Sequence, residues 1–277
     1  MPRGRYAPGI LFNDYMEASD VFKKIKRVRG WGFLLAFLIG LMLWQASVWL
    51  FQLPAFILPP PVQVATRFIT AITDGTLVRN FSTTLMEVTV GLLAGSSTAA
   101  ILGYLLAKSK GLERVLAPFL VASQAIPIAA IAPLLVIWFG PGIFSKVLIC
   151  ALIVFFPVLI NSMVGVRSVP ENLHDLMCSL HASSIQTLRY LEFPAALPVL
   201  LGGLRIGATL SVIGAVVGEL VGADRGLGFL INVGRGQYDT ALVFVAVFTL
   251  VALALSLYGV VVWLEKKFLR WQKENES

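Results

Sequence analysis

A few ionisable side chains interrupt otherwise apolar stretches of this sequence. Glu87, Lys146, Arg205 and Glu219 each lie within such a stretch. Charged groups in apolar surroundings are costly, and they usually form ion pairs or line a path for a solute. Counted along the stretches, both acids and Lys146 fall toward one end, whereas Arg205 and the polar Asn161 fall toward the other. A pathway-lining role and a structural pair between Lys146 and one of the acids both remain open.

His174, Cys178 and His181 form a second polar pattern, because they stand at positions i, i+4 and i+7. On one continuous helix they would share a face and could hold zinc or copper. His181 falls where that helix is expected to end, and three ligands would leave the site open. We therefore expect these residues to form the polar flank of a surface helix, with no bound metal.

No motif for enzymatic chemistry accompanies these residues. The sequence has no G-x-x-x-x-G-K-[ST] phosphate-binding loop and no Ser/His/Asp hydrolase motif. Gly226-Leu227-Gly228 is too short to indicate a dinucleotide site. We expect no cofactor and no catalytic residue, so that any ATP hydrolysis would come from another chain.

The composition indicates a membrane as the surroundings of the chain. Of its 277 residues, 57% are hydrophobic and 13% are charged, whereas soluble domains carry about 25% charged residues. Apolar runs of about 20 residues match the thickness of a hydrocarbon core and are too long for strands of a membrane barrel. The sequence therefore predicts an all-α polytopic membrane protein with about six transmembrane helices, over Trp31–Leu53, Phe81–Ala107, Val115–Trp138, Ile143–Val166, Leu197–Val221 and Ala241–Leu264.

Lysine and arginine are distributed unevenly between the two sides of this bundle. Basic residues precede the first span, separate the second from the third, and follow the last. Such an excess marks cytoplasmic segments, so both termini are expected in the cytoplasm, and the net charge of +7 needs no nucleic acid. The expected parts are a cytoplasmic tail (1–30), a first transmembrane helix retained as an anchor (31–53), an external amphipathic segment (54–80), a transmembrane core (81–264) with a cytoplasmic loop (167–193), and a cytoplasmic tail (265–277).

The external segment begins with a stiff run of three prolines, Pro59 to Pro61. Apolar residues then recur at helical spacing between polar ones. This pattern predicts a short amphipathic helix. It could lie on the outer membrane surface or simply connect two spans.

The cytoplasmic loop 167–193 carries the signals of two short helices. Ser168 to Glu171 and Ser183 to Gln186 both have the form of a capping box. Between them, apolar residues recur at i, i+3, i+4 and i+7. A second helix should run from about Ile185 toward Phe193 and stop at Pro194. A capped, amphipathic protrusion favours a docking surface over a simple connection.

Small residues recur at four-residue spacing in two of the predicted spans. Gly91 and Gly95 lie in the second span. Two such series belong to the fifth helix, and they are Gly203, Gly207 and Ser211, and Gly214, Gly218 and Gly222. Such spacing lets helices approach closely.

Several stretches together resemble the permease subunits of binding-protein-dependent ABC importers, within the branch for nitrate, sulfonates, taurine and vitamin precursors. The resemblance covers most of the chain after about residue 55. The family's loop motif, Glu-Ala-Ala followed by Gly, is replaced here by Asp175-Leu176-Met177 and His181. The stretches that carry the resemblance are Ile57–Pro61, Ile126–Ala129, Pro133–Gly140, Phe155–Pro157, Phe193–Pro198 and Gly226–Ile231.

The resemblance implies a transport subunit without catalysis of its own. Its partners would be two ABC ATPase subunits, an extracytoplasmic solute-binding protein, a second permease copy as a homodimer, and membrane lipid. The loop would contact the ATPase through Leu173, Asp175, Leu176, Met177, Leu180, His181, Ser183 and Gln186. Pathway or gate candidates are Glu87, Gln124, Lys146, Asn161, Arg205 and Glu219.

The sequence gives less information about the transported solute than about any other property of the protein. Ser123–Pro127 and the stretch around Gly226 look most like permeases for vitamin-related heterocycles, such as riboflavin or pyrimidine precursors of thiamine. Sulfonate, taurine or nitrate is the alternative. An ion-coupled transporter and a membrane-embedded enzyme remain the alternatives from other classes. An ion-coupled transporter would work without an ATPase partner. A membrane-embedded enzyme would need a cluster of catalytic carboxylates or histidines within the spans.

Overall fold

The computed structural model describes residues 32 and 35–269, and within them it contains helices and no strand. The chain divides into two compact units, residues 1–63 and 64–277. In the first unit, one apolar helix spans Leu35–Leu50. The expected tail 1–30 and the start of the expected first span lie outside the described residues. The described part of this helix has 16 residues and would be roughly 24 Å long.

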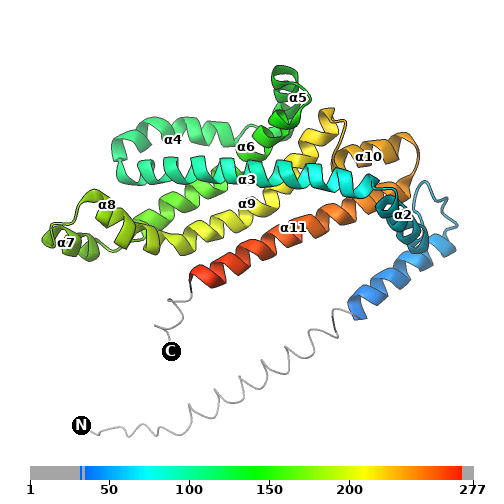
Figure 1. Cartoon of the computed structure of the whole chain (residues 1–277), viewed down its shortest axis with the longest axis horizontal. Helices are drawn as coiled ribbons and strands as arrows, with labels where there is room; N and C mark the ends of the chain where they lie inside the picture. Colours follow the sequence, from blue (N-terminus) through cyan, green and yellow to red (C-terminus); the bar gives the residue numbers. More distant parts are fainter. Residues whose placement is uncertain (1–31, 33–34, 270–277) are drawn as a thin grey trace, which may run out of the picture. The chain divides into compact units, whose positions relative to one another are not determined.

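Four helices of the second unit are long and apolar enough to cross a membrane (Figure 1). They are α3 (Thr76–Lys108), α6 (Ile143–Arg167), α9 (Phe193–Gly222) and α11 (Thr240–Phe268). Each covers one of the predicted spans. The all-α polytopic architecture is thus confirmed, because a backbone inside lipid must satisfy its polar groups within helices.

The predicted span Val115–Trp138 is not one continuous helix. Two helices, α4 (Lys110–Gln124) and α5 (Ile128–Phe139), meet there at a bend of 94°. Pro127 precedes α5 in an extended conformation, with φ −67° and ψ 117°. A proline lacks the N–H that would continue the helix and disfavours helical geometry in the residue before it. The sequence therefore breaks the span at Ile126-Pro127.

Helix α6 packs against both α3 and α9, and these three helices form the centre of the second unit. Glycines permit the close approach. A Cβ atom on Gly95 of α3 would lie 2.5 Å from the carbonyl oxygen of Ala151, and one on Gly214 of α9 would lie 2.9 Å from Cα of Cys150. The prediction of close helix packing from small-residue spacing is confirmed at both contacts.

Two shorter helices occupy the end of the bundle at which α9 finishes. Helix α2 (Pro61–Thr73) confirms the predicted amphipathic helix, with Val64 and Ala71 buried and Val62 exposed. Helix α10 (Leu227–Gly236) was not predicted. Nε of Arg67 in α2 donates a hydrogen bond of 2.7 Å to Oδ2 of Asp239, which also caps α11.

The loop after α6 holds α7 (Glu171–Ser179) and α8 (Ser184–Thr187). The predicted capping box at Ser168 is wrong, because Pro170 takes the N-cap position and Ser168 Oγ donates to the carbonyl oxygen of Gly165. The capping box of Ser183 and Gln186 is confirmed.

The predicted helix end at Pro194 is also wrong. A π-helical turn, η1 (Leu188–Glu192), joins α8 to α9, so that helical backbone continues over Ser184–Gly222. In this turn the backbone N–H of Phe193 donates to the carbonyl oxygen of Leu188, five residues earlier. Pro194 then lies directly after the π turn, as the second residue of α9.

The distribution of basic residues predicts that α7 faces the cytoplasm. Cys178 on α7 is exposed and Cys150 is buried in α6, so a membrane-impermeant maleimide should label the native chain at Cys178 alone. We expect labelling in inside-out vesicles and none in intact spheroplasts. A C178S/Y238C variant should show the reverse, because Tyr238 is exposed between α10 and α11. Labelling of both positions from the same side would contradict this topology.

Candidate functional site

Three of the ionisable residues singled out from the sequence come together in the structure. Glu87 of α3, Lys146 of α6 and Glu219 of α9 are 1%, 2% and 0% exposed. With Asn80 and Thr84 of α3, they form what we call the buried acid cluster, at the end of the bundle that carries α10. Helices that contact one another through glycines bring these residues together.

Glu219 fixes the beginning of α10. Its Oε1 accepts a hydrogen bond of 2.6 Å from Thr84 Oγ1, and its Oε2 accepts one of 2.5 Å from the backbone N–H of Gly228. Thr84 Oγ1 in turn accepts 2.8 Å from the N–H of Leu227, and Asn80 Oδ1 accepts 2.8 Å from the N–H of Gly226. These contacts satisfy N–H groups that a helix start leaves unpaired.

The glycines at this start are required by the same carboxylate. Gly226 has φ +116°, which disfavours any side chain. A Cβ atom there would lie 2.2 Å from Oε1 of Glu219. The two glycines of the Gly226-Leu227-Gly228 stretch therefore allow the backbone to come close to the buried carboxylate of Glu219, because they have no side chain that would collide with it.

Lys146 does not form the direct pair considered from the sequence. Its Nζ donates to the carbonyl oxygen of Pro141, and none of the salt bridges in the described part of the chain includes Lys146. Oε2 of Glu87 is buried without a hydrogen-bond partner among the described residues.

The other pathway candidates lie apart from this cluster. Arg205 is not a lone cation, because it pairs with Glu265 of α11 and lies over the ring of Tyr258 at 5.6 Å. Asn161 Nδ2 donates to the carbonyl oxygen of Pro157 at 2.8 Å. Gln124 is exposed as the last residue of α4, next to the bend.

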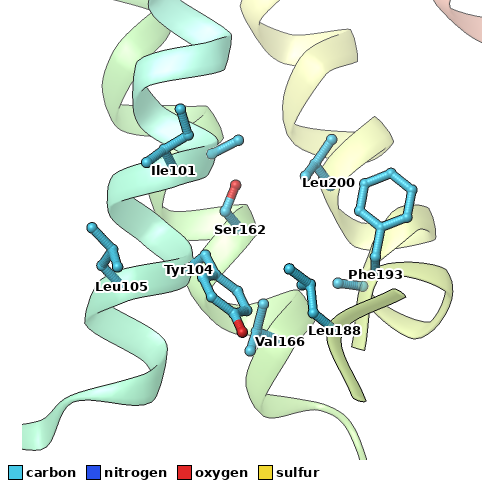
Figure 2. Close-up of a pocket in the computed structure, with 10 residues that line it drawn as sticks. Ile101, Tyr104, Leu105, Ser162, Val166, Leu188, Phe193 and Leu200 are labelled. Carbon is cyan, nitrogen blue, oxygen red and sulfur yellow. The ribbon is translucent and has the colours of Figure 1, made fainter. Parts of the chain in front are cut away.

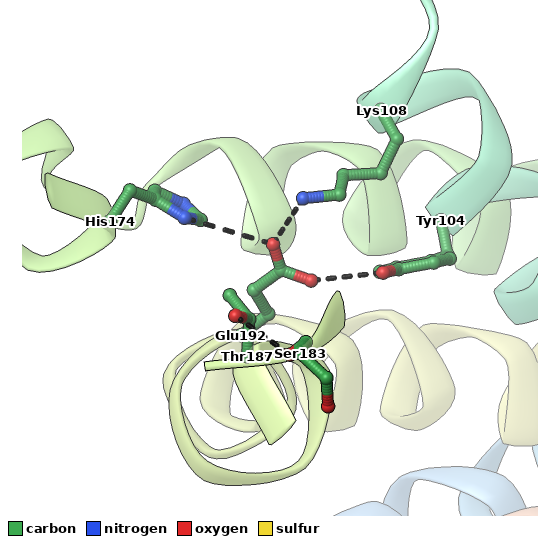
Figure 3. A network of polar contacts seen from close by, with 6 residues as sticks. All are labelled: Tyr104, Lys108, His174, Ser183, Thr187 and Glu192. Carbon is green, nitrogen blue, oxygen red and sulfur yellow. Dashed lines mark hydrogen bonds and ion pairs between the residues drawn. The ribbon is translucent and has the colours of Figure 1, made fainter. Parts of the chain in front are cut away.

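A third buried carboxylate, Glu192, was missed by the sequence analysis. It is 1% exposed in η1. Its Oε2 accepts 3.0 Å from Tyr104 Oη, and its Oε1 accepts from Lys108 Nζ. Nδ1 of His174 lies 3.8 Å from the same Oε1 (Figure 3). The sequence did contain a signal for this contact. Glu192 is an acid where the cytoplasmic loop joins a span, and Lys108 is a base at the end of another span.

The exposed side of α7 carries the residues that the sequence assigned to docking. Leu173, Leu176 and Leu180 are 37%, 52% and 67% exposed, and α7 buries none of its residues.

His181 lies beyond the helix end with φ +54°, so it does not continue the face of His174 and Cys178. No group of three metal-ligating side chains exists among the described residues.

An apolar cavity of about 270 Å³ lies beside Glu192, between α3, α6 and the start of α9 (Figure 2). Tyr104, Leu188 and Phe193 line it. Ser162 also faces it, and its buried Oγ has no hydrogen-bond partner in the described part of the chain.

The bundle with its protruding α7 and its buried polar clusters defines a helical membrane transport protein. Residues 91–270 match the family described as "Binding-protein-dependent transport system inner membrane component", and the chain belongs to this family. It is a permease subunit of an ABC importer and a multi-pass protein of the inner membrane, and ATP hydrolysis belongs to a separate subunit.

Individual relatives agree with this assignment. The chain is 48% identical over 241 residues to the riboflavin transport system permease protein RibX of Chloroflexus aurantiacus, covering 87% of this chain and 90% of that protein. It is 35% identical to the formylaminopyrimidine transport permease protein ThiX of Halalkalibacterium halodurans, covering 87% and 96%. The fold resembles a chain of the inward-facing MetNI methionine ABC transporter, with a TM-score of 0.62, 19% identity, and coverage of 71% and 97%.

We expect the substitution Thr84→Val to destabilise the protein by about 1–3 kcal/mol, because it leaves a buried N–H and a carboxylate oxygen unpaired at nearly constant volume. Thr83→Val is the matched control, since Thr83 Oγ1 donates only to the carbonyl oxygen of Arg79 in its own helix. The measurement is thermal unfolding of the purified protein in detergent. Equal unfolding temperatures for the two variants would show that the bridge to α10 contributes no stability.

Proposed function

We propose that this permease carries a vitamin-related heterocycle, such as riboflavin or a pyrimidine precursor of thiamine, delivered by an extracytoplasmic binding protein. The observation that supports it is the 48% identity to a riboflavin permease over about nine-tenths of both chains. A relative that transports formylaminopyrimidine at 35% identity supports the wider class of solutes.

The chain itself supplies a passage and no catalysis. Glu87, Lys146 and Glu219 are gate or pathway candidates by their burial at one end of α3, α6 and α9. Because Glu219 holds the start of α10, a change at this cluster would move the loop that faces the binding protein.

An anion-specific passage is less well supported. Nitrate and sulfonates are anions, and taurine is a zwitterion that carries an anionic sulfonate group. A passage specific for these anionic groups would offer unpaired cations. Arg205 is neutralised by Glu265, and Lys146 lies within the field of two acids. A neutral heterocycle requires no such cation.

The ATPase would bind the exposed face of α7, on the cytoplasmic side. Asp175, Leu176, Met177 and His181 correspond to the family's Glu-Ala-Ala and Gly positions. His181 has the positive φ, +54°, that favours glycine, and histidine is among the residues that tolerate it best. The turn after α7 can therefore keep the shape of the family's loop despite the replacement. Ser183 and Gln186 hold the next helix start.

A second copy of the permease would bind along α4 and α5. Helix α4 buries none of its residues, and Phe119, Ile137 and Trp138 are 70%, 74% and 66% exposed. A bent span that is so weakly covered by its own chain suits contact with a symmetric partner. Membrane lipid would cover the remaining apolar surface.

The docking assignment predicts the effect of a charge on α7. Burial of one Leu side chain contributes about 1.5–3 kcal/mol, so Leu176→Asp should weaken ATPase binding by about 10–100-fold. Tyr238→Asp is the control, because Tyr238 is also exposed but lies on the α10–α11 loop. The measurement is co-purification with the ATPase, together with solute-stimulated ATP hydrolysis. Normal binding by the Leu176→Asp variant would exclude this face.

The proposed solute is tested by uptake into liposomes that contain the permease, its ATPase and its binding protein. Labelled riboflavin, an aminopyrimidine, taurine and nitrate are supplied in parallel. We expect ATP-dependent uptake of riboflavin or the aminopyrimidine. Uptake of taurine or nitrate without either heterocycle would reject the proposal, and uptake without ATP would indicate an ion-coupled transporter.

A further inference from the structure

At Glu192, three elements of the permease that lie toward the loop of α7 meet through polar side chains. The residue belongs to η1, and its carboxylate accepts hydrogen bonds from Tyr104 and Lys108 at the end of α3. His174 of α7 lies within ion-pair distance when protonated. Figure 3 shows the three side chains converging on the carboxylate.

The burial of Glu192 makes these partners necessary. The side chain is 1% exposed, and a buried carboxylate is strongly unfavourable unless it is paired and hydrogen-bonded. Lys108 supplies the opposite charge from a side chain that is 46% exposed. The position of η1 therefore depends on α3, although the two segments are more than 80 residues apart.

Helix α7 depends on the same carboxylate. It buries none of its residues, and its leucines face away from the bundle. Among the described residues, the contact of His174 with Glu192 is the only polar side-chain contact between α7 and a spanning helix. A movement of α7 therefore reaches the bundle through Glu192 and through the backbone at the two ends of the loop.

The apolar cavity gives η1 room to move. Leu188 and Phe193, which flank the π turn, line it together with Tyr104 (Figure 2). This cavity is open on one side, since Ile101, Leu105 and Phe193 in its lining are 64%, 47% and 54% exposed, so the chain itself packs these side chains only in part. π turns of this kind occur frequently at functional sites. The segment is thus fixed by polar contacts on one side and unsupported on the other.

We propose that Glu192 is a positioning residue that couples the movement of α7 to α3 and α9. The inference rests on the proposed docking of the ATPase at α7 and goes beyond it, because it identifies where the movement enters the membrane domain. When α7 moves, the carboxylate carries η1, and with it the start of α9, relative to the end of α3.

The first experiment tests the contact itself in the full-length permease in lipid nanodiscs. We expect Glu192→Gln to raise the hydrogen–deuterium exchange rate of the α7 amides by ~10-fold, because the helix loses its contact with the bundle. His174→Asn should have the same effect while leaving the contacts of Tyr104 and Lys108. Glu265→Gln is the control, since it breaks the ion pair with Arg205 and does not involve α7.

The second experiment tests the coupling in the complex with the ATPase and the binding protein. Glu192→Gln should retain basal ATP hydrolysis but lower solute uptake per ATP by ~10-fold, within the range of allosteric coupling. A double variant, K108Q/E192Q, removes both charges. It should unfold at nearly the wild-type temperature and still couple poorly, which a purely structural role would not produce.

Unchanged α7 exchange in both Glu192→Gln and His174→Asn would overturn the proposal, and so would wild-type uptake per ATP in either Glu192 variant. If Glu192→Gln does not fold, the double variant decides by the same two readouts. A wild-type complex that hydrolyses ATP without importing any solute would instead contradict the proposed function. In that case the exchange measurement still decides whether Glu192 holds α7.

Discussion

The close contact of α6 with α3 on one side and α9 on the other is the constraint on which the rest of the second unit depends. At Gly95 and Gly214 the neighbouring backbone is so near that no side chain would fit. Interfaces between helices in lipid rely on such packing, because lipid tails offer no hydrophobic gain for helix association. The three helices are thereby fixed in register along their length, which determines the side chains that meet at each end.

At each end of the core, a buried carboxylate forms hydrogen bonds that depend on how the three helices are aligned. Glu219 satisfies the N–H groups at the start of α10, and Glu192 accepts hydrogen bonds from the end of α3. Each carboxylate links a spanning helix to a short segment that protrudes from the bundle. Under the proposed coupling of ATPase movement to transport, such links would pass a movement of either short segment to the spanning helices.

The weakly covered α4–α5 pair has a different physical role. Its bend follows from Pro127. One side of the pair packs on its own chain, with Ala132 and Leu135 of α5 buried, whereas Phe119, Ile137 and Trp138 are exposed. The exposed apolar side chains of the pair need lipid or another subunit to cover them, whereas the central three helices cover one another through glycine contacts.

The sequence by itself determined the features that depend on neighbouring residues. Hydropathy located α3, α6, α9 and α11, the spacing of Ser183 and Gln186 predicted a capping box, and glycine spacing predicted close packing. The same local rules failed at Pro127, where a break was read as one span, and at Pro194, where η1 lets the helix continue.

Only the tertiary structure decided which polar groups meet. Thr84 bonds Glu219 across 135 residues and Lys108 bonds Glu192 across 84, and no sequence periodicity relates such positions. Lys146 donates to the backbone carbonyl of Pro141 rather than to an acid. The packing of the helices places this carbonyl oxygen within hydrogen-bond distance of the ammonium group, so charge alone does not determine the partner. The physical reason is that a buried polar group must be satisfied by whatever the packed helices bring near it.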